Sequence, residues 1–324
     1  MGSKSLAAQE MMSILETLSV IISIVEFIMG IFGNGFIILI LCNDWIRKRK
    51  SSLIDFILMG LAGFRICFLC ATLSTITFQL VYEKVLVSKS VLMIVIILWT
   101  GSNYFCTASS TCLTVFYFFK IANFSNPVFL WMKQKMRVVL LVIILGSVFS
   151  FCVSLVFIDV FTSVSMQHLV KIEQNFTSHY TKKFYDSLIY FIPLNIILFI
   201  FFVVSLSSFL LLLFSLWRHT KRMKLQGMYS RDLSMEAHVR AMKAMISSLL
   251  LFITHYVGYL MIMLEYCVQD TVTIRVFMHL LLFLYPSGHP FLLILWNSKL
   301  KQASLCVLRK LKCVKEDIIP HYQK

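Results

Sequence analysis

A stripe rich in polar side chains follows one face of a long uncharged segment of this chain. Residues 90–119 carry no formal charge, and the stripe recurs through them at steps of three and four residues. This spacing places side chains on one face of a helix. A helix that met only lipid would not need such a face, so we expect a central helix that joins an outer cavity to an inner surface. The stripe consists of Trp99, Asn103, Cys106, Ser110, Leu113, Tyr117 and Lys120.

Three histidines inside other apolar segments are the side chains best suited to acid–base or metal chemistry. His255, His279 and His289 have no carboxylate or cysteine at a spacing that would build a catalytic set or a metal site, so we expect neither a metal nor a cofactor. His255 and His279 fall in the outer halves of their segments, where they could line a pocket. His289 lies nearer the inner end, which favours a structural role.

The composition excludes an ordinary soluble protein. Of the 324 residues, 59% are hydrophobic and only 14% are charged, whereas soluble domains carry about 25% charged residues. The net charge of +15 would suit nucleic acid, but the charges cluster between apolar segments, as in cytoplasmic loops. No nucleic-acid-binding motif accompanies them. The bilayer is therefore the expected solvent, and nucleic acid is not an expected partner.

Seven apolar segments, each longer than about 20 residues, predict seven transmembrane helices. Helices are required because lipid cannot satisfy a bare backbone. The predicted fold is an all-α membrane protein, a single seven-transmembrane bundle that comprises residues 1–324. The segments are residues 17–42, 53–82, 90–119, 138–158, 187–217, 244–264 and 276–296.

The distribution of Lys and Arg predicts the orientation. Most of these residues follow the first, third, fifth and seventh segments, which the positive-inside rule places in the cytoplasm. Residues 1–16 are then an extracellular N-terminus, and residues 297–324 are a cytoplasmic tail. Asn175 begins the sequon N-F-T in the long outer loop, so we expect glycosylation there. Cys306 and Cys313 lie in the basic tail, where we expect free thiols rather than palmitoylated cysteines.

Ionisable groups at membrane depth usually face the interior of a bundle. Arg65 lies midway along the second segment. We expect it to be the centre of structural hydrogen bonds rather than a ligand contact. Asn34 in the first segment is its expected partner, because an amide offers a carbonyl acceptor to guanidinium donors. Glu26 either faces the bundle or sits near the outer interface. Asp55 lies near the inner interface, where we expect a solvated carboxylate.

Four motifs resemble one receptor family, the type 2 taste receptors, which detect bitter compounds. The third segment reads L-x-x-F-Y-x-x-K-I-A at residues 113–122, and the fifth ends with S-L-x-x-H-T-x-x-M at 215–223. The following loop has A-H-x-x-A-x-K at 237–243, and the seventh segment closes with H-P-F-L-L-I-L-W-N-S-K-L-K at 289–301. Asn34 and Arg65 match the family's marked positions. Pro290 and Phe252 depart from its pattern, which usually has Ser and often Tyr there.

The resemblance implies a G-protein-coupled receptor in the plasma membrane. Small bitter molecules would bind in an outer pocket, and a gustducin-type heterotrimeric G protein would act through phospholipase C and calcium release. Tyr117, Lys120 and His219 would lie near the G-protein face. Membrane lipids and further receptor copies are the remaining candidate partners. The residues that the resemblance places in the pocket are Trp99, Asn103, His255, Tyr259 and His279. Without the polar stripe that it heads, Trp99 would be interpreted as an anchor at the membrane interface.

Three other protein classes compete with this interpretation. A vomeronasal type 1 receptor would signal similarly, but the L-x-x-F-Y-x-x-K-I-A and H-T-x-x-M motifs argue against it. A secondary transporter would often show internal repeats and matching broken helices, which the sequence lacks. A membrane enzyme would need a convergent acid–base or metal set, and none can be assembled from this sequence.

Overall fold

The chain folds into long helices, and the computed structural model describes residues 2–48, 52–82, 89–170, 176–225, 233–267 and 271–318. Within these ranges the chain contains helices and short links but no strand. The helices are α1 (Gly2–Lys48), α2 (Leu53–Tyr82), α3 (Lys89–Ile121), α4 (Pro127–Gln134), α5 (Met136–Val170), α6 (Phe176–Leu225), α7 (Leu233–Cys267), α8 (Thr271–Trp296) and α9 (Ser298–Ile318).

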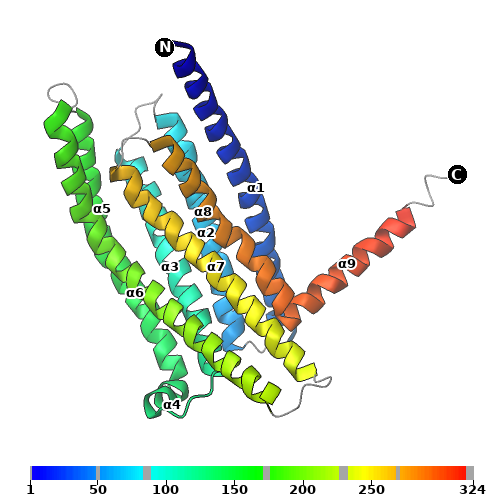
Figure 1. Cartoon of the computed structure of the whole chain (residues 1–324). Helices are drawn as coiled ribbons and strands as arrows, with labels where there is room; N and C mark the ends of the chain where they lie inside the picture. Colours follow the sequence, from blue (N-terminus) through cyan, green and yellow to red (C-terminus); the bar gives the residue numbers. More distant parts are fainter. Residues whose placement is uncertain are drawn as a thin grey trace.

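Seven of the described helices run lengthwise side by side in one bundle, whereas α4 lies at its lower end and α9 projects away from it (Figure 1). Helix α3 packs against α2, α5 and α6, and α8 packs against α1, α2 and α7. The expected central position of α3 is therefore observed. The C-terminal ends of α1, α3, α6 and α8 point toward the lower end, so side chains far apart in sequence can gather there.

Six described helices are long and apolar enough to cross a membrane. This confirms the prediction of a helical membrane bundle. Helix α3 is not among the six, and its described part holds buried polar side chains that include Ser102, Asn103 and Thr111. The spans are Ser13–Arg47, Leu53–Thr77, Met136–Ile158, Leu198–Arg222, Met242–Met261 and Val276–Trp296.

Helical structure extends into three segments that the sequence analysis treated as terminus, loop or tail. Helix α1 begins at Gly2, so most of residues 1–16 continue the first membrane helix. Helix α4 begins where the Asn126 side chain accepts hydrogen bonds from the backbone N–H groups of Val128 and Phe129 and Pro127 occupies the first turn. Helix α9 fills most of the predicted tail.

Helices α7 and α8 are in close contact at Gly258. A Cβ atom at this position would lie 2.8 Å from the Cβ atom of Leu281 and 3.1 Å from that residue's backbone carbonyl carbon. These atoms belong to or adjoin the backbone of α8, so they cannot move aside as the end of a flexible side chain would. The two helices depend on glycine here for their contact.

Gly258→Ala should destabilise the protein by about 1–3 kcal/mol, because the added methyl group forces the two helices apart. The measurement is thermal unfolding of purified protein in lipid nanodiscs. Gly146→Ala is the matched control, since a Cβ atom there would meet nothing within 4 Å. The control should change stability by no more than about 0.5 kcal/mol. Equal Tm values for the two variants would contradict the close contact.

Candidate ligand cavity and polar core

A small cavity is enclosed by α3, α6 and α7. Helix α3 contributes an amide and a hydroxyl group to its wall, and α7 contributes three aromatic rings and an imidazole. The space open to the centre of a water molecule is about 10 Å³, which is room for roughly one water. The lining residues are Asn103, Thr107, Leu198, Phe252, His255, Tyr256 and Tyr259.

Stacked aromatic rings border the cavity. Tyr259 stacks on Trp99 with ring centroids 6.0 Å apart and planes inclined by 11°, and Tyr256 stacks on Phe202 at 3.9 Å and 14°. Trp99 also lies 6.2 Å from the ring of Phe68. Aromatic contacts of this kind add stability beyond the burial of their area. A molecule larger than water can therefore occupy the cavity only if some of its lining side chains move.

His255 is the unsatisfied polar group of the cavity wall. The residue is 4% exposed, and neither ring nitrogen has a hydrogen bond of regular geometry to a described residue. Its ring packs edge-on against Phe68 at 5.5 Å and lies 5.2 Å from the ring of Tyr285. A buried polar group without a partner carries a desolvation cost that a hydrogen-bonding ligand would remove.

The pocket residues expected from the sequence do not all meet at this cavity. Asn103, His255 and Tyr259 line it, and Trp99 borders it through Tyr259. His279 is buried on α8, a helix that contributes no lining residue. The sequence analysis missed four lining residues, although the helical spacing of the α7 positions with His255 and Tyr259 could have identified two of them; the four are Thr107, Leu198, Phe252 and Tyr256.

A polar core centred on Arg65 lies beneath the cavity wall. The Arg65 side chain is fully buried, and its Nη1 atom donates a hydrogen bond of 3.0 Å to Nδ1 of His289. The guanidinium carbon lies 4.7 Å from the centre of the Tyr285 ring, a cation–π contact. The Tyr285 hydroxyl group in turn donates to Oγ of Ser110 at 2.9 Å. These contacts join α2, α8 and α3.

The predicted hydrogen bond between Asn34 and Arg65 is wrong. The Asn34 amide donates instead to the backbone carbonyl groups of Gly30 at 2.8 Å and Pro286 at 2.9 Å. Its carbonyl oxygen has no partner among the described residues. Pro290 has no N–H group to bond the Pro286 carbonyl within the helix. That vacancy leaves the carbonyl free for Asn34, which therefore ties α1 to α8.

The other polar residues singled out in the sequence have different degrees of burial. Glu26 is half-buried on α1, and its Oε2 atom is enclosed without a partner, so the carboxyl group faces partly into the bundle. Tyr117 is half-buried near the C-terminal end of α3, while Lys120 and His219 are exposed. Asn175 lies outside the described residues.

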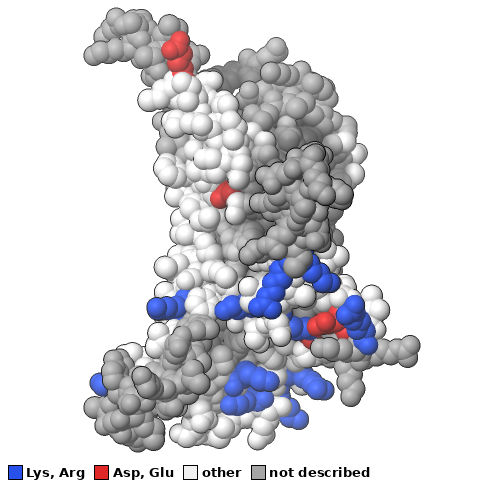
Figure 2. Space-filling view, turned by 90° about the vertical axis from the view of Figure 1, so that its right-hand side faces the viewer, with Lys and Arg blue, Asp and Glu red and all other residues white. Residues whose placement is uncertain are grey.

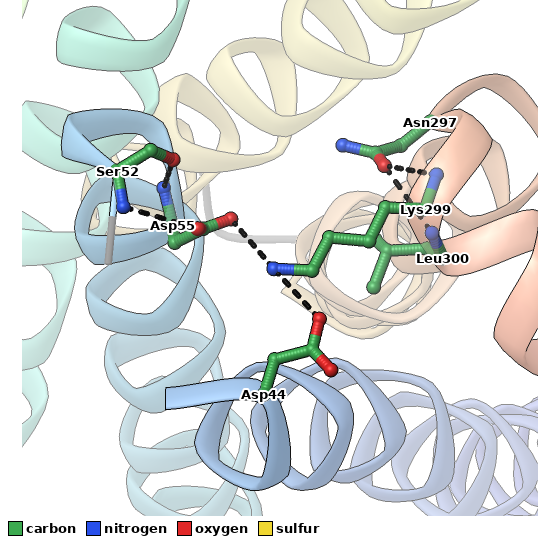
Figure 3. A network of polar contacts seen from close by, with 6 residues as sticks. All are labelled: Asp44, Ser52, Asp55, Asn297, Lys299 and Leu300. Carbon is green, nitrogen blue, oxygen red and sulfur yellow. Dashed lines mark hydrogen bonds and ion pairs between the residues drawn. The ribbon is translucent and has the colours of Figure 1, made fainter. Parts of the chain in front are cut away.

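A second polar cluster joins three helices at the lower end of the bundle. Nζ of Lys299 lies 3.0 Å from Oδ2 of Asp44 and 3.2 Å from Oδ1 of Asp55, and Figure 3 shows the amine between the two carboxylates. The prediction of a simply solvated Asp55 is therefore wrong. The Asn297 side chain accepts hydrogen bonds from the backbone N–H groups of Lys299 and Leu300, which caps α9 at this point.

Lys299 remains charged in this cluster. Partial burial disfavours the charged amine, but the hydrogen bonds and the charges of Asp44 and Asp55 outweigh that effect and raise the pKa of Lys299 above its ordinary value. The first turn of α9 is consequently fixed to α1 and α2 by a charged residue. We call Lys299, Asp44 and Asp55 the inner clamp.

Comparison with known proteins adds to this geometry. A sequence profile described as "Taste receptor protein (TAS2R)" matches residues 11–312. The chain belongs to this family of taste receptors. Taste receptor type 2 member 7 of Macaca mulatta is 41% identical over 90% of this chain and 93% of its own length. Taste receptor type 2 member 8 of Pongo pygmaeus is 40% identical over 90% and 94%. Member 9 of Homo sapiens is 38% identical over 94% and 97%.

Family membership confirms the resemblance carried by the four sequence motifs. The chain is a type 2 taste receptor, and so a membrane protein of the G-protein-coupled class rather than an enzyme. Receptors of this class bind ligands and couple to G proteins. The cavity is the candidate region for ligand binding, and the lower end of the bundle is the candidate region for G-protein coupling.

Lys299→Gln should loosen the inner end of the receptor, because the two carboxylates of the inner clamp would face each other without a cation. We expect a loss of roughly 1 kcal/mol, the upper range for partly exposed ion pairs. Hydrogen exchange in nanodiscs should rise around residues 298–304.

Two further variants separate the clamp from the general loss of a positive charge. Lys301→Gln removes an exposed charge from the same helix and should leave exchange unchanged. Adding Asp44→Asn to Lys299→Gln should restore part of the protection, because it removes the repulsion between the carboxylates. Unchanged exchange in Lys299→Gln itself would show that the clamp does not hold α9.

Proposed function

We propose that this receptor detects small bitter molecules in the cavity between α3, α6 and α7. The observation that carries the proposal is an aromatic cavity with a buried imidazole that lacks a partner, in a chain of the type 2 taste receptor family. Ligand sites in proteins are mostly apolar, with a few polar groups that fix orientation. The lining of this cavity follows that pattern.

The mechanism that we propose begins with the separation of stacked rings. The cavity has room for roughly one water, so a bitter molecule must part Trp99 from Tyr259 before it can settle. His255 and Asn103 would then offer hydrogen bonds to its polar atoms. A ligand changes the population of receptor states only if it binds one state better than the other. Loss of the closed stack is the structural difference on which such a preference can act.

In the proposed topology, seven helices cross the bilayer with the N-terminus outside and the C-terminus in the cytoplasm. Helix α3 would add one crossing to the six apolar spans, since its 33 residues reach about 50 Å at 1.5 Å per residue. Lys and Arg gather at the lower end of the described surface, and the upper part of the same view is nearly free of them (Figure 2). Cytoplasmic ends carry this excess of positive charge.

The inner end would bind the G protein. Lys120 and His219 are exposed near the lower ends of α3 and α6, and Tyr117 lies half-buried one turn from Lys120. We propose that these residues contact a gustducin-type G protein, which activates phospholipase C and releases calcium. The same basic end would attract anionic lipid headgroups of the plasma membrane, the proposed location.

Cells that express this chain with a gustducin-type G protein should give calcium signals to members of a panel of bitter compounds. Asn103→Ala, Trp99→Ala and His255→Phe should each raise the half-maximal agonist concentration about tenfold or more, because each removes a contact from the proposed binding site.

Surface expression, measured by antibody labelling of intact cells, must match the unchanged receptor for each variant. Phe149→Ala is the matched control, since this ring is 69% exposed on the outside of the bundle. A silent panel with normal surface expression would contradict the bitter-receptor proposal. Equal potency shifts in Phe149→Ala would contradict the cavity as the binding site.

A further inference from the structure

Arg65 is a buried cation without a counter-charge. It is 0% exposed, and its Nε and Nη2 atoms have no hydrogen-bond partner among the described residues. The ion pairs observed between described residues belong instead to Lys299. Arginine stays protonated in proteins, so burial cannot be relieved by loss of its proton. The cost of removing this charge from water must be offset by something that the neighbouring side chains supply or hold.

The neighbours of Arg65 supply no negative charge. A guanidinium group has only donors, so Nδ1 of His289 must be an acceptor, and the proton of a neutral His289 ring sits on Nε2. Tyr285 offers the face of its ring, and its hydroxyl group is engaged with Ser110. The cation–π contact offsets only part of the desolvation cost of a fully buried charge. Cys106 also lies beside Arg65, but its thiol carries no charge. The cluster of Arg65, His289, Tyr285, Ser110 and Cys106 therefore keeps a net charge of one positive unit.

We propose that the Nε and Nη2 edge of Arg65 binds a small inorganic anion of the halide class, chloride in its natural surroundings. These two N–H groups point from one side of the planar guanidinium group, which is the geometry that holds an anion with two donors. A water molecule could also accept these hydrogen bonds, but it would leave the charge uncompensated. An anion meets both requirements of the site.

The proposed anion site adjoins the ligand cavity but is separate from it. The ring of Tyr285 lies 5.2 Å from that of His255, which lines the cavity, and 5.2 Å from that of His289. None of the anion's proposed ligands lines the cavity. The anion would reinforce the junction of α2, α3 and α8, so its effect should appear in receptor stability even without an agonist.

The test measures thermal unfolding of the purified full-length receptor in nanodiscs made of uncharged lipid. Sodium chloride, sodium bromide and sodium gluconate are compared at constant ionic strength. Gluconate is the control anion, because it is too bulky to bind beside a fully buried side chain. Chloride and bromide should raise Tm by a few degrees for each tenfold increase above their dissociation constants, whereas gluconate should not. Equal Tm values in all three salts would overturn the proposal and leave a site that holds water only.

Variants and bromide scattering locate the site. Lys299→Gln, which removes a cation that already has two carboxylate partners, should keep the chloride dependence. Arg65→Met should lose it, and Arg65→Lys should shift it to higher chloride concentrations. A full chloride effect in a folded Arg65→Met receptor would overturn the proposal. If neither Arg65 variant folds, crystals of the unchanged receptor grown in bromide decide: anomalous density beside the guanidinium group supports the site, and its absence overturns it.

Discussion

The fully buried guanidinium group of Arg65 is the constraint on which the rest of the bundle depends. A charge at membrane depth is expensive, so helices must close around it and supply hydrogen bonds. Its contacts with His289 and Tyr285 join α2 to α8, and Tyr285 extends the core to Ser110 on α3. Asn34 adds α1 through the carbonyl group of Pro286. Each such hydrogen bond contributes only about 0.5–1.5 kcal/mol, but leaving its groups unpaired in a dry interior would cost more.

Helix α3 connects this core to both ends of the receptor. Its outer half supplies Asn103 and Thr107 to the cavity, and one turn further Thr111 accepts a 2.8 Å hydrogen bond from Ser205 on α6. Its inner end carries Tyr117 and Lys120. A ligand that rearranged the aromatic wall would thus act on a helix already bonded to α6 and α8. A helix with polar partners on several sides shifts between discrete arrangements more readily than it deforms gradually.

Particular residues show how far the sequence leads. Helical steps of three and four revealed the inward face of α3, and the rarity of charge at membrane depth identified Arg65 as a buried centre. Its partners could not be deduced, because Asn34 and His289 both suited a guanidinium donor and only the helix packing brings His289 to it. The same limit applies to the cavity. Both His255 and His279 were expected to line it, and of the two only His255 does. Asn126 and Pro127 form a helix-start pattern for α4, a helix that the sequence analysis did not predict. The inner clamp joins residues of α1, α2 and α9 that no local pattern connects.

The most direct measurement is a structure of the receptor with a bitter agonist, determined by electron cryo-microscopy in nanodiscs. We predict agonist density between Asn103 and His255, with the rings of Trp99 and Tyr259 separated and the contacts of Arg65 with His289 and Tyr285 retained. Agonist density at the inner end or outside the bundle, with Trp99 and Tyr259 still stacked as they are here, would contradict the cavity as the site of recognition.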